Sequence, residues 1–336
     1  MRIGKLNNDA LDALVLSKLR HTRREVSCAP QIGVDCAALD FGGSLIVVST
    51  DPITSATANL GRLTVHVSCN DAAAAGAEPV GLLVTLLAPP DCTEADIDAL
   101  TDELASAAAE ANVDIIGGHT EITGAVTRMI TCATVIARSI NDAPIMPDGA
   151  EPGDDIVLTK SAGMEGAAII ASDLPELLGD ISECDIARAK GFFESISVVP
   201  EGICAARNGA KAMHDVTEGG VYGALWELAH ASGCKLIVES ALIPVDGVTR
   251  RICDAAGVDV YRLISSGCML IACADGMQMC ERLGQIGVSA RVVGRAASGS
   301  GVEIDGRLIE PPGADELYKL FEERQGRAMQ RGVIVV

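Results

Sequence analysis

Aromatic side chains are scarce in this chain of 336 residues, because only 2% of them are Phe, Trp or Tyr. Trp226 is the single tryptophan. Proteins that bind single-stranded nucleic acid stack bases on aromatic rings, so such stacking cannot dominate recognition here. The cores must instead be built from Ala, Val, Leu and Ile, for which an apolar fraction of 49% is ample.

Positive charge is also in short supply. The sequence has 26 Lys and Arg residues against 46 Asp and Glu residues, which gives a formal net charge of −20. Such a field repels nucleic acid and anionic membrane surfaces, so we expect neither as a partner. It would repel a bare nucleotide as well. If the protein binds ATP, divalent cations must neutralise both the phosphates and the carboxylates that face them.

The 12 cysteines include no C-x-x-C pair, and many of them lie in apolar, Ala-rich surroundings. We interpret them as small buried hydrophobic residues in a reducing compartment. Long hydrophobic runs are lacking too: the longest, over 80–90, is too short to cross a bilayer. Residues 1–20 contain no uninterrupted apolar segment of the secretory kind. The sequence therefore predicts a cytoplasmic protein.

Short acidic signatures stand where apolar segments run into turns. They are Gly33–Ala38, Ser49–Pro52, Asn70–Asp71, Gly117–Glu121 and His214–Gly220. Carboxylates at the ends of buried strands are costly to desolvate unless a cation meets them. Mg²⁺ prefers oxygen ligands of this kind. The signatures therefore predict a site for a metal-bound polyphosphate.

The first half alternates between strand-like and helix-like patterns. Leu45–Ser49 is a β-branched run that places Asp51 at the mouth of a buried strand, and Leu63–Ala77 has helical composition. On that helix we expect His66 to be a packed residue, whereas an acid at Asp71 stands out among small apolar neighbours.

A capping signature at Thr93 and Asp96 predicts a helix that runs to about residue 112. A strand is predicted over 113–116. The glycine pair that follows predicts a sharp turn, at which His119, Thr120 and Glu121 gather.

The length exceeds the size at which one hydrophobic core stops growing, so two domains are expected. Proline and glycine accumulate without periodicity between Asn141 and Asp154, which is typical of a domain boundary. We therefore predict an N-terminal domain over 1–145 and a C-terminal domain over 150–336.

Two glycine-containing turns open helices in the second half. Lys160–Gly166 follows a predicted strand over Asp155–Thr159 and leads into a helix from Ala167, and Asp215–Gly220 leads into an amphipathic helix over Val221–Ser232. Such turns can present backbone N–H groups to an anion, although each is a weak signal alone. The candidate nucleotide-binding residues in these turns are Lys160, Gly163, Thr217, Gly219 and Gly220.

In their order and separations, the motifs resemble those of the AIR synthase (PurM-like) superfamily. They are Asp35–Ala38, Ser49–Asp51, Asn70–Asp71 with Gly76–Pro79, Gly117–Thr120, Asp215–Gly220 and Ser265–Gly267. The resemblance covers essentially the whole chain and is greatest to the branch of the hydrogenase-maturation carbamoyl dehydratase HypE and its unassigned relatives. It implies an α/β (α+β) fold of two PurM-like domains, the N-terminal one forming a dimer sheet or barrel.

The resemblance further implies an enzyme that uses ATP and Mg²⁺ to activate a carbonyl, amide or phosphate oxygen of a small-molecule substrate, with ATP near the interface of a homodimer. Asp35, Asp51, Asp71 and Asp215 would then hold Mg²⁺. The nucleotide site would be lined by Asn70, Gly117, Gly118 and Thr120. The candidate catalytic residues are Asp51, Asp71 and His119. His119 could orient phosphate, act as an acid, or simply pack within the turn.

One departure from HypE concerns the carrier of the substrate. HypE holds its carbamoyl group on a terminal cysteine, whereas this sequence ends with Gly332–Val336, which carries no thiol. We therefore do not expect hydrogenase maturation in the usual sense. A non-catalytic nucleotide-binding partner and a small-molecule kinase similar to thiamine-monophosphate kinase are the alternatives. We expect the tail to add a strand to a sheet edge, with a docking peptide or disorder as the other options.

Overall fold

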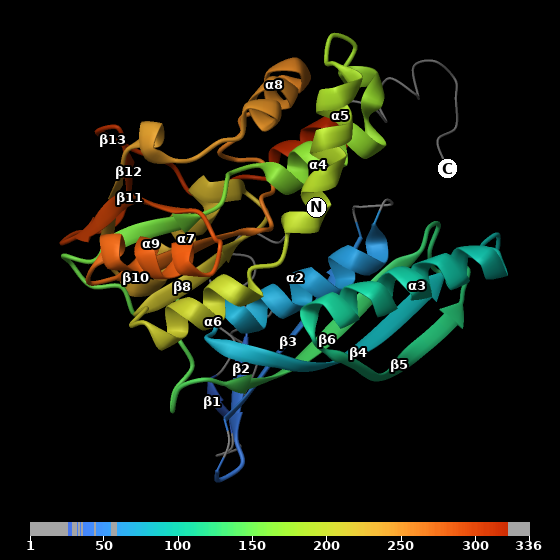
Figure 1. Cartoon of the computed structure of the whole chain (residues 1–336), viewed down its shortest axis with the longest axis horizontal. Coiled ribbons are helices and arrows are strands. Elements are labelled where there is room, and N and C mark those ends of the chain that lie inside the picture. Colours follow the sequence, from blue (N-terminus) through green and yellow to red (C-terminus); the bar gives the residue numbers. More distant parts are fainter. Residues whose placement is uncertain are drawn as a thin grey trace.

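The structure, a computed structural model, describes residues 26–28, 32, 34, 36–43, 45–54 and 59–321. The candidate metal ligand Asp35 and the tail Gly332–Val336 lie outside these residues. The described part has the mixed α/β architecture that the sequence predicts, with two separate sheets and helices around them (Figure 1).

The first sheet is open and, within the described residues, has six strands. Their spatial order is β1 (Val26–Cys28), β2 (Ala37–Asp40), β3 (Leu45–Ile53), β6 (Ile130–Ser139), β4 (Ala77–Ala88) and β5 (Asp114–Ile122). Neighbouring strands are antiparallel except for the parallel pair β4 and β5. β3 extends to Ile53, which pairs with Thr131, so Asp51 lies within the strand rather than at its mouth as predicted.

Two helices, α2 (Leu60–Ala74) and α3 (Glu94–Ala111), pack on this sheet. The capping prediction for α3 is confirmed: the Thr93 hydroxyl accepts from the Asp96 N–H, and the Asp96 carboxylate accepts from the Thr93 N–H. The helix ends at Asn112, whose backbone is left-handed.

The prediction of a turn at Gly117 and Gly118 is wrong. β5 continues through both glycines to Ile122 and stays paired with β4. A Cβ atom on Gly118 would lie 1.8 Å from the Val84 carbonyl oxygen. Because glycine has no Cβ, the two strands can approach closely at this point, and the glycine serves strand pairing instead of chain reversal.

The second sheet belongs to the C-terminal half. In spatial order it contains β13 (Arg307–Leu308), β12 (Gly301–Ile304), β9 (Lys235–Val238), β11 (Ala290–Ala297), β7 (Asp155–Thr159), β10 (Cys268–Cys273) and β8 (Ala212–Val216). Within this sheet, β9 and β12 are the only described strands that pair in parallel. The strand predicted over 155–159 is confirmed. Residues in β7, β8 and β10 are buried at nearly every position, as expected of strands covered on both faces.

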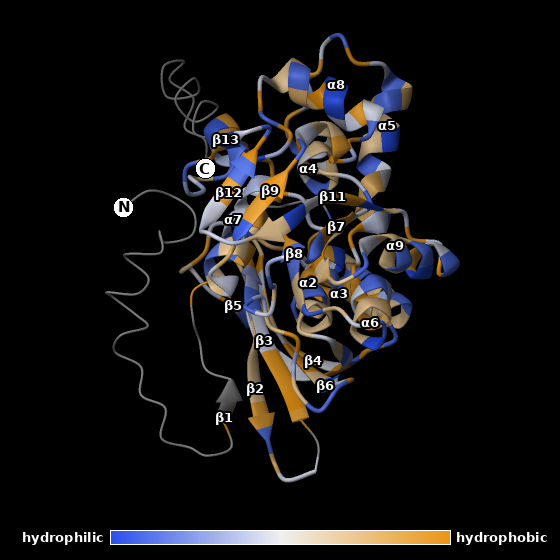
Figure 2. Ribbon diagram, turned by 90° about the vertical axis from the view of Figure 1, so that its left-hand side faces the viewer, coloured by the Kyte–Doolittle hydropathy of each residue, from blue (hydrophilic) through white to orange (hydrophobic). Residues whose placement is uncertain are grey.

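Helices cover both faces of this sheet and form a lobe beside it. They are α4 (Met164–Asp173), α5 (Glu183–Lys190), α6 (Val199–Arg207), α7 (Gly220–Ser232), α8 (Gly247–Ala256) and α9 (Gly276–Gln285), with the short 3-10 helices η2 (Pro175–Leu177), η3 (Gly191–Ser195) and η4 (Ser240–Leu242). Helices α8 and α9 alternate hydrophilic and hydrophobic residues, which fits their position at the surface (Figure 2). α4 begins at Met164, earlier than the predicted Ala167, because Gly163 adopts the left-handed conformation that opens the helix.

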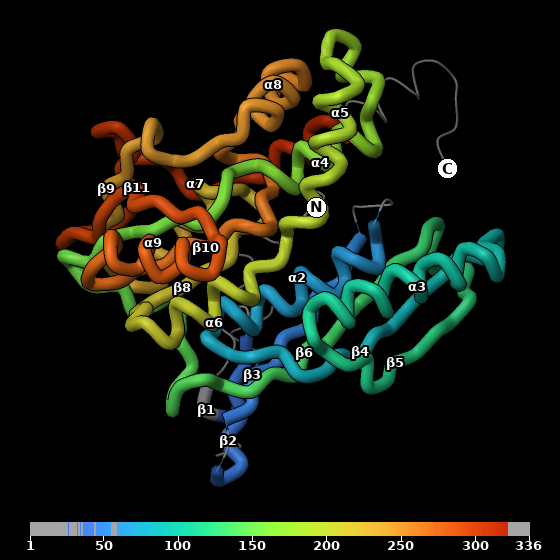
Figure 3. Tube along the Cα trace, in the orientation of Figure 1, coloured from blue at the N-terminus to red at the C-terminus, as the bar shows by residue number. Residues whose placement is uncertain are grey.

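The two halves meet where α6 packs against α2, after the chain has crossed from β6 to β7 through residues 140–154 (Figure 3). The fully buried Asn70 on α2 fastens this junction. Its side-chain oxygen accepts from the Val198 N–H at 2.7 Å, and its nitrogen donates to the Ile196 carbonyl at 2.8 Å. The amide of Asn70 therefore joins the N-terminal half to the segment that leads into α6.

We predict that Asn70→Ala lowers the free energy of unfolding by roughly 2–4 kcal/mol, because two buried backbone groups would lose their partners. Chemical denaturation measures this difference. Asn208→Ala is the matched control, since the Asn208 amide donates to the Cys204 carbonyl at an exposed position, and it should cost less than about 1 kcal/mol. Equal losses in the two variants would contradict the role assigned to Asn70.

Candidate functional site

A cavity of about 120 Å³ lies where the two halves meet. Three of the four predicted metal ligands, Asp51, Asp71 and Asp215, line it together. They come from β3, α2 and β8, which are distant in the sequence. The apolar part of the wall is formed by Pro52, Ile53, Leu63, Val67, Ile169 and Ile264.

The cavity carboxylates differ in exposure. Asp71 and Asp215 are buried, with 3% and 2% of their surfaces exposed, and Asp51 is half-buried. The Ser49 hydroxyl donates to Asp71 Oδ2 at 2.6 Å and fixes the orientation of that carboxylate. Burying ionised carboxylates is unfavourable unless a cation compensates them. The arrangement therefore suits a cationic ligand.

The carboxylates around the cavity fit a metal ion that is shared with phosphates better than one that is held by the protein alone. Among the described residues, no three Asp, Glu, His or Cys side chains converge closely enough to hold an ion by themselves. Mg²⁺ usually keeps several waters and is bound through one or two carboxylates together with substrate phosphates. Asp51, Asp71 and Asp215 around one cavity fit such shared ligation rather than a cage made of protein alone.

The turn before α7 contributes Thr217 and Glu218 to the cavity wall. The N–H of Gly219, however, donates to Asp315 Oδ2 at 2.7 Å, so a carboxylate of the protein already caps this helix. The Tyr318 hydroxyl donates to Glu218 Oε1 at 2.7 Å. The anion-binding position predicted at Gly219 is thus taken by a residue near the end of the described chain.

Gly220 has a packing role. A Cβ atom there would lie 2.6 Å from the Tyr261 carbonyl oxygen, and the residue has a φ of 62°. Both observations explain glycine at this position without a ligand.

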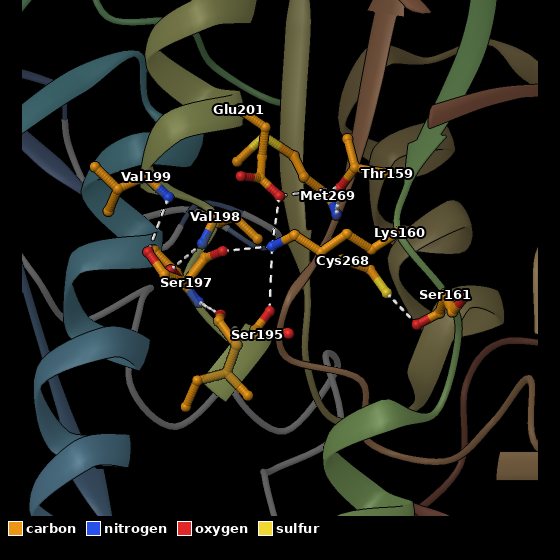
Figure 4. Close-up of polar contacts among 12 residues, drawn as sticks. Thr159, Lys160, Ser161, Ser195, Ser197, Val198, Val199, Glu201, Cys268 and Met269 are labelled. Carbon is orange, nitrogen blue, oxygen red and sulfur yellow. Dashed lines mark hydrogen bonds and ion pairs between the residues drawn. The ribbon is translucent and has the colours of Figure 1, made fainter. Parts of the chain in front are cut away.

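The turn before α4 is also bonded inward. Lys160 Nζ lies 2.7 Å from Glu201 Oε1 and donates to the carbonyls of Ser195 and Ser197, at 3.2 and 2.5 Å (Figure 4). The Gly163 N–H donates to Ser265 Oγ at 2.6 Å. Lys160 is therefore paired with the buried carboxylate of Glu201 and bonded to the same segment whose backbone Asn70 holds.

The Gly117–Thr120 motif lies away from this cavity in the same chain. The register runs from Asp51 to Ala133, then to Val84 and Gly118, so three strand spacings separate the first and last, or roughly 14 Å. His119 is exposed on the edge strand, with its Nε2 3.5 Å from Glu121 Oε2. The structure therefore brings the aspartates together but leaves this motif on the outer edge of the sheet.

A further carboxylate, Glu165, lines the cavity and was missed by the sequence reasoning. It is 4% exposed and accepts from the Ser266 N–H at 2.9 Å. Burial raises its pKa to about 7, with Asp315 and Glu218 adding to the effect, while the hydrogen bonds from Ser266 act in the opposite direction. The only sequence signal for Glu165 was its position between Gly163 and Gly166 at the start of a predicted helix.

The raised pKa of Glu165 predicts how the stability of the folded protein depends on pH. Folding raises the pKa of Glu165 from 4.5 to about 7. The contribution of Glu165 to the stability of the folded state is therefore fully present below pH 4.5 and is lost as the pH rises through 7. Glu165→Gln keeps an acceptor for the Ser266 N–H and removes the charge. In urea unfolding without divalent metal, the variant should match the wild type near pH 4.5 and be more stable at pH 8 by about 3 kcal/mol.

Glu281→Gln on the exposed face of α9 is the control for this measurement and should show no such pH dependence. A difference between Glu165→Gln and the wild type that is the same at both pH values would show that the burial of this carboxyl is not the cause.

The fold and the cavity define a class of two-domain α/β proteins with a PurM-like fold. The chain superposes on Escherichia coli HypE with a TM-score of 0.71 at 22% identity, covering 88% of this chain and 95% of that chain. It also superposes on AaThiL complexed with AMPPCP and TMP, with a TM-score of 0.72 at 19% identity over 85% and 92% of the two chains. At these identities the likeness concerns the fold.

The chain belongs to the AIR synthase related family, as the motifs indicated. The N-terminal domain of that family matches residues 33–138, and its C-terminal domain matches residues 151–307. Sequence relatives include the carbamoyl dehydratase HypE of Cupriavidus necator, 28% identical over 275 residues, which cover 78% of this chain and 76% of that protein. A putative hydrogenase expression/formation protein of Methanocaldococcus jannaschii is 27% identical over 316 residues, 91% of each chain.

Across the described residues, no helix combines the length and the apolar character needed to cross a bilayer.

Proposed function

We propose that the protein is a Mg²⁺-dependent enzyme that transfers the γ-phosphoryl group of ATP to an oxygen of a small substrate, which can be a carbonyl, amide or phosphate oxygen. The observation that carries the proposal is the gathering of Asp51, Asp71 and Asp215 around one cavity between the domains. Family membership supports it, because related proteins include carbamoyl dehydratases. Solved neighbours of the same fold include HypE in complex with ATP.

In this proposal, Asp51, Asp71 and Asp215 hold Mg²⁺ together with the phosphates. The bound metal would neutralise the charge of the polyphosphate and orient the transferred group. The Ser49 hydroxyl keeps the Asp71 carboxylate aimed at the cavity. Leu63 and Ile169 form a wall that limits access of water to the reacting phosphoryl group.

Asp51→Asn tests the proposal directly. The substitution removes a ligand charge with little change in shape, so Mg²⁺-dependent release of ADP should fall by about 100-fold or more while the protein stays folded. Calorimetry with ATP and Mg²⁺, together with an ADP-release assay, provides the measurement. The control is Asp98→Asn on the exposed surface of α3, which should retain the wild-type rate.

The same assays separate the proposed reaction from its alternatives. Unchanged turnover in Asp51→Asn would refute the metal role of this carboxylate. Tight binding of Mg²⁺-ATP without turnover by the wild type would indicate a non-catalytic nucleotide-binding protein. A stable phosphorylated product would indicate a small-molecule kinase.

We further propose that the protein is a homodimer that pairs through β5. The edge strand β5 carries the exposed apolar residues Ile115, Ile116 and Ile122, and the neighbouring strand β4 exposes Val80 and Leu83. An open edge of this kind is a template for pairing with another chain, and the surface that continues the sheet best is a second copy of it. The motif Gly117–Thr120 would then face the partner subunit rather than the cavity of its own chain.

Ile116→Lys should convert such a dimer into a monomer, because it places a charge in the apolar edge. Size-exclusion chromatography with light scattering measures the change. Met277→Lys on α9 is the matched control, since Met277 is also an exposed apolar residue, at 73% exposure, and it should leave the dimer intact. A wild type that is monomeric at high micromolar concentration would contradict the pairing.

A further inference from the structure

Glu165 is fixed at the cavity wall by hydrogen bonds on either side of it. The first turn of α4 is tied to residues 264–266 by the Gly163 N–H, which donates to Ser265 Oγ at 2.6 Å, and by the Gly166 N–H, which donates to the Ile264 carbonyl at 3.1 Å. The Ser266 N–H in turn donates to Glu165 Oε2 at 2.9 Å. A carboxylate held in this way is preorganised relative to anything that enters the cavity.

The surroundings of Glu165 are acidic. Of the described residues that line the cavity, none is Lys, Arg or His, and the ionisable ones besides Glu165 are Asp51, Asp71, Asp215 and Glu218. Asp315, which is not part of the cavity wall, also raises the pKa of Glu165. Burial, with smaller contributions from Asp315 and Glu218, raises the pKa of Glu165 to about 7. A group with such a pKa exchanges protons efficiently at neutral pH.

We propose that Glu165 takes the proton of the acceptor group when the γ-phosphoryl group is transferred. This inference rests on the proposed function and goes beyond it, because it assigns a catalytic role to a residue outside the aspartate set. The geometry that supports it is a buried carboxylate, fixed by the backbone, on the same cavity wall as Asp51, Asp71 and Asp215.

For a carboxamide acceptor, the step balances as follows. The carbonyl oxygen forms a bond to the γ-phosphorus, and the bond from that phosphorus to the β–γ bridging oxygen breaks, so that ADP leaves. The amide nitrogen forms a double bond to carbon and loses one proton to the Glu165 carboxylate. The products are an O-phosphorylated imidate, ADP and the neutral carboxylic acid. With an alcohol or water, the hydroxyl proton passes to Glu165 in the same way.

The inference narrows the substrate class. An acceptor that delivers a proton to Glu165 must carry an O–H or N–H group. An additional negative charge on the acceptor would be repelled by the carboxylates of the wall. A neutral carboxamide or alcohol therefore fits this cavity better than a carboxylate or a phosphate monoester.

Glu165→Gln tests the role with Mg²⁺ and ATP alone, where water is the acceptor. Glutamine still accepts the hydrogen bond from Ser266 but cannot take a proton. We expect Mg²⁺-ATP affinity within about twofold of the wild type by calorimetry and a loss of ADP release of about 100-fold. We also expect the wild-type rate to increase as the pH rises through 7 and the rate of the variant to lack this increase.

A second measurement is independent of turnover. The infrared spectrum of the wild type at pH 6 should contain a carbonyl band from protonated Glu165, identified as the absorption that Glu165→Gln loses and Glu281→Gln retains. Asp315, whose pKa burial raises to about 6, should contribute equally to all three spectra. Absence of that band from the wild type would overturn the inference.

The remaining outcomes separate this inference from the proposed function. If Glu165→Gln keeps the wild-type rate and pH profile, the proton-accepting role is wrong and the proposed function stands. If the variant loses Mg²⁺-ATP binding, Glu165 serves nucleotide or metal binding, which also overturns the inference. If the wild type neither binds nor turns over Mg²⁺-ATP, both proposals fail.

Discussion

Negative charge enclosed between the two domains is the constraint on which this structure depends. Asp71, Asp215 and Glu165 are each at most 4% exposed and share one cavity. Like charges in such a medium repel strongly, and the fold must hold them there by packing energy and directed hydrogen bonds. Two local features reduce the repulsion between these carboxylates or prepare them for a cation. Glu165 binds a proton more readily, whereas Asp71 is held ready for a cation by the Ser49 hydroxyl.

Helix α2 carries both a carboxylate of the cavity and the residue that joins the two halves of the chain. Asn70 and Asp71 are adjacent on the helix and therefore point in different directions, about 100° apart. Asn70 fastens the backbone of the segment before α6, and Asp71 faces the cavity. Any shift of α2 relative to the second domain would move the carboxylate as well. The geometry of the site is thus set by the same helix that joins the two halves.

The sequence alone predicts those parts that depend on local patterns. Capping at Thr93 is one example, since its two hydrogen bonds join residues only three apart. The buried strand at Asp155–Thr159 is another, because a continuous β-branched and aliphatic run identifies it. The convergence of Asp51, Asp71 and Asp215 followed from the order and spacing of recognisable motifs rather than from the physics of the chain.

What could not be predicted depends on contacts between distant residues. The cap of Gly219 by Asp315 joins positions 96 apart, and the hydrogen bond that fixes Glu165 joins positions 101 apart. The glycine pair in β5 was misread for a related reason. Glycines permit both a turn and a close strand contact, and only the position of Val84 on the neighbouring strand decides between them.

The close contact at Gly118 has a consequence for how this motif is studied. Any side chain at this position would push β5 off the sheet, and a glycine requirement set by backbone crowding would look the same in an alignment as one set by a nucleotide. If a substitution at Gly118 abolished function, the immediate cause would be the loss of pairing between β5 and β4, not the loss of a ligand contact. Thr120, which the crowding does not restrict, is the more informative position at which to ask what the motif touches.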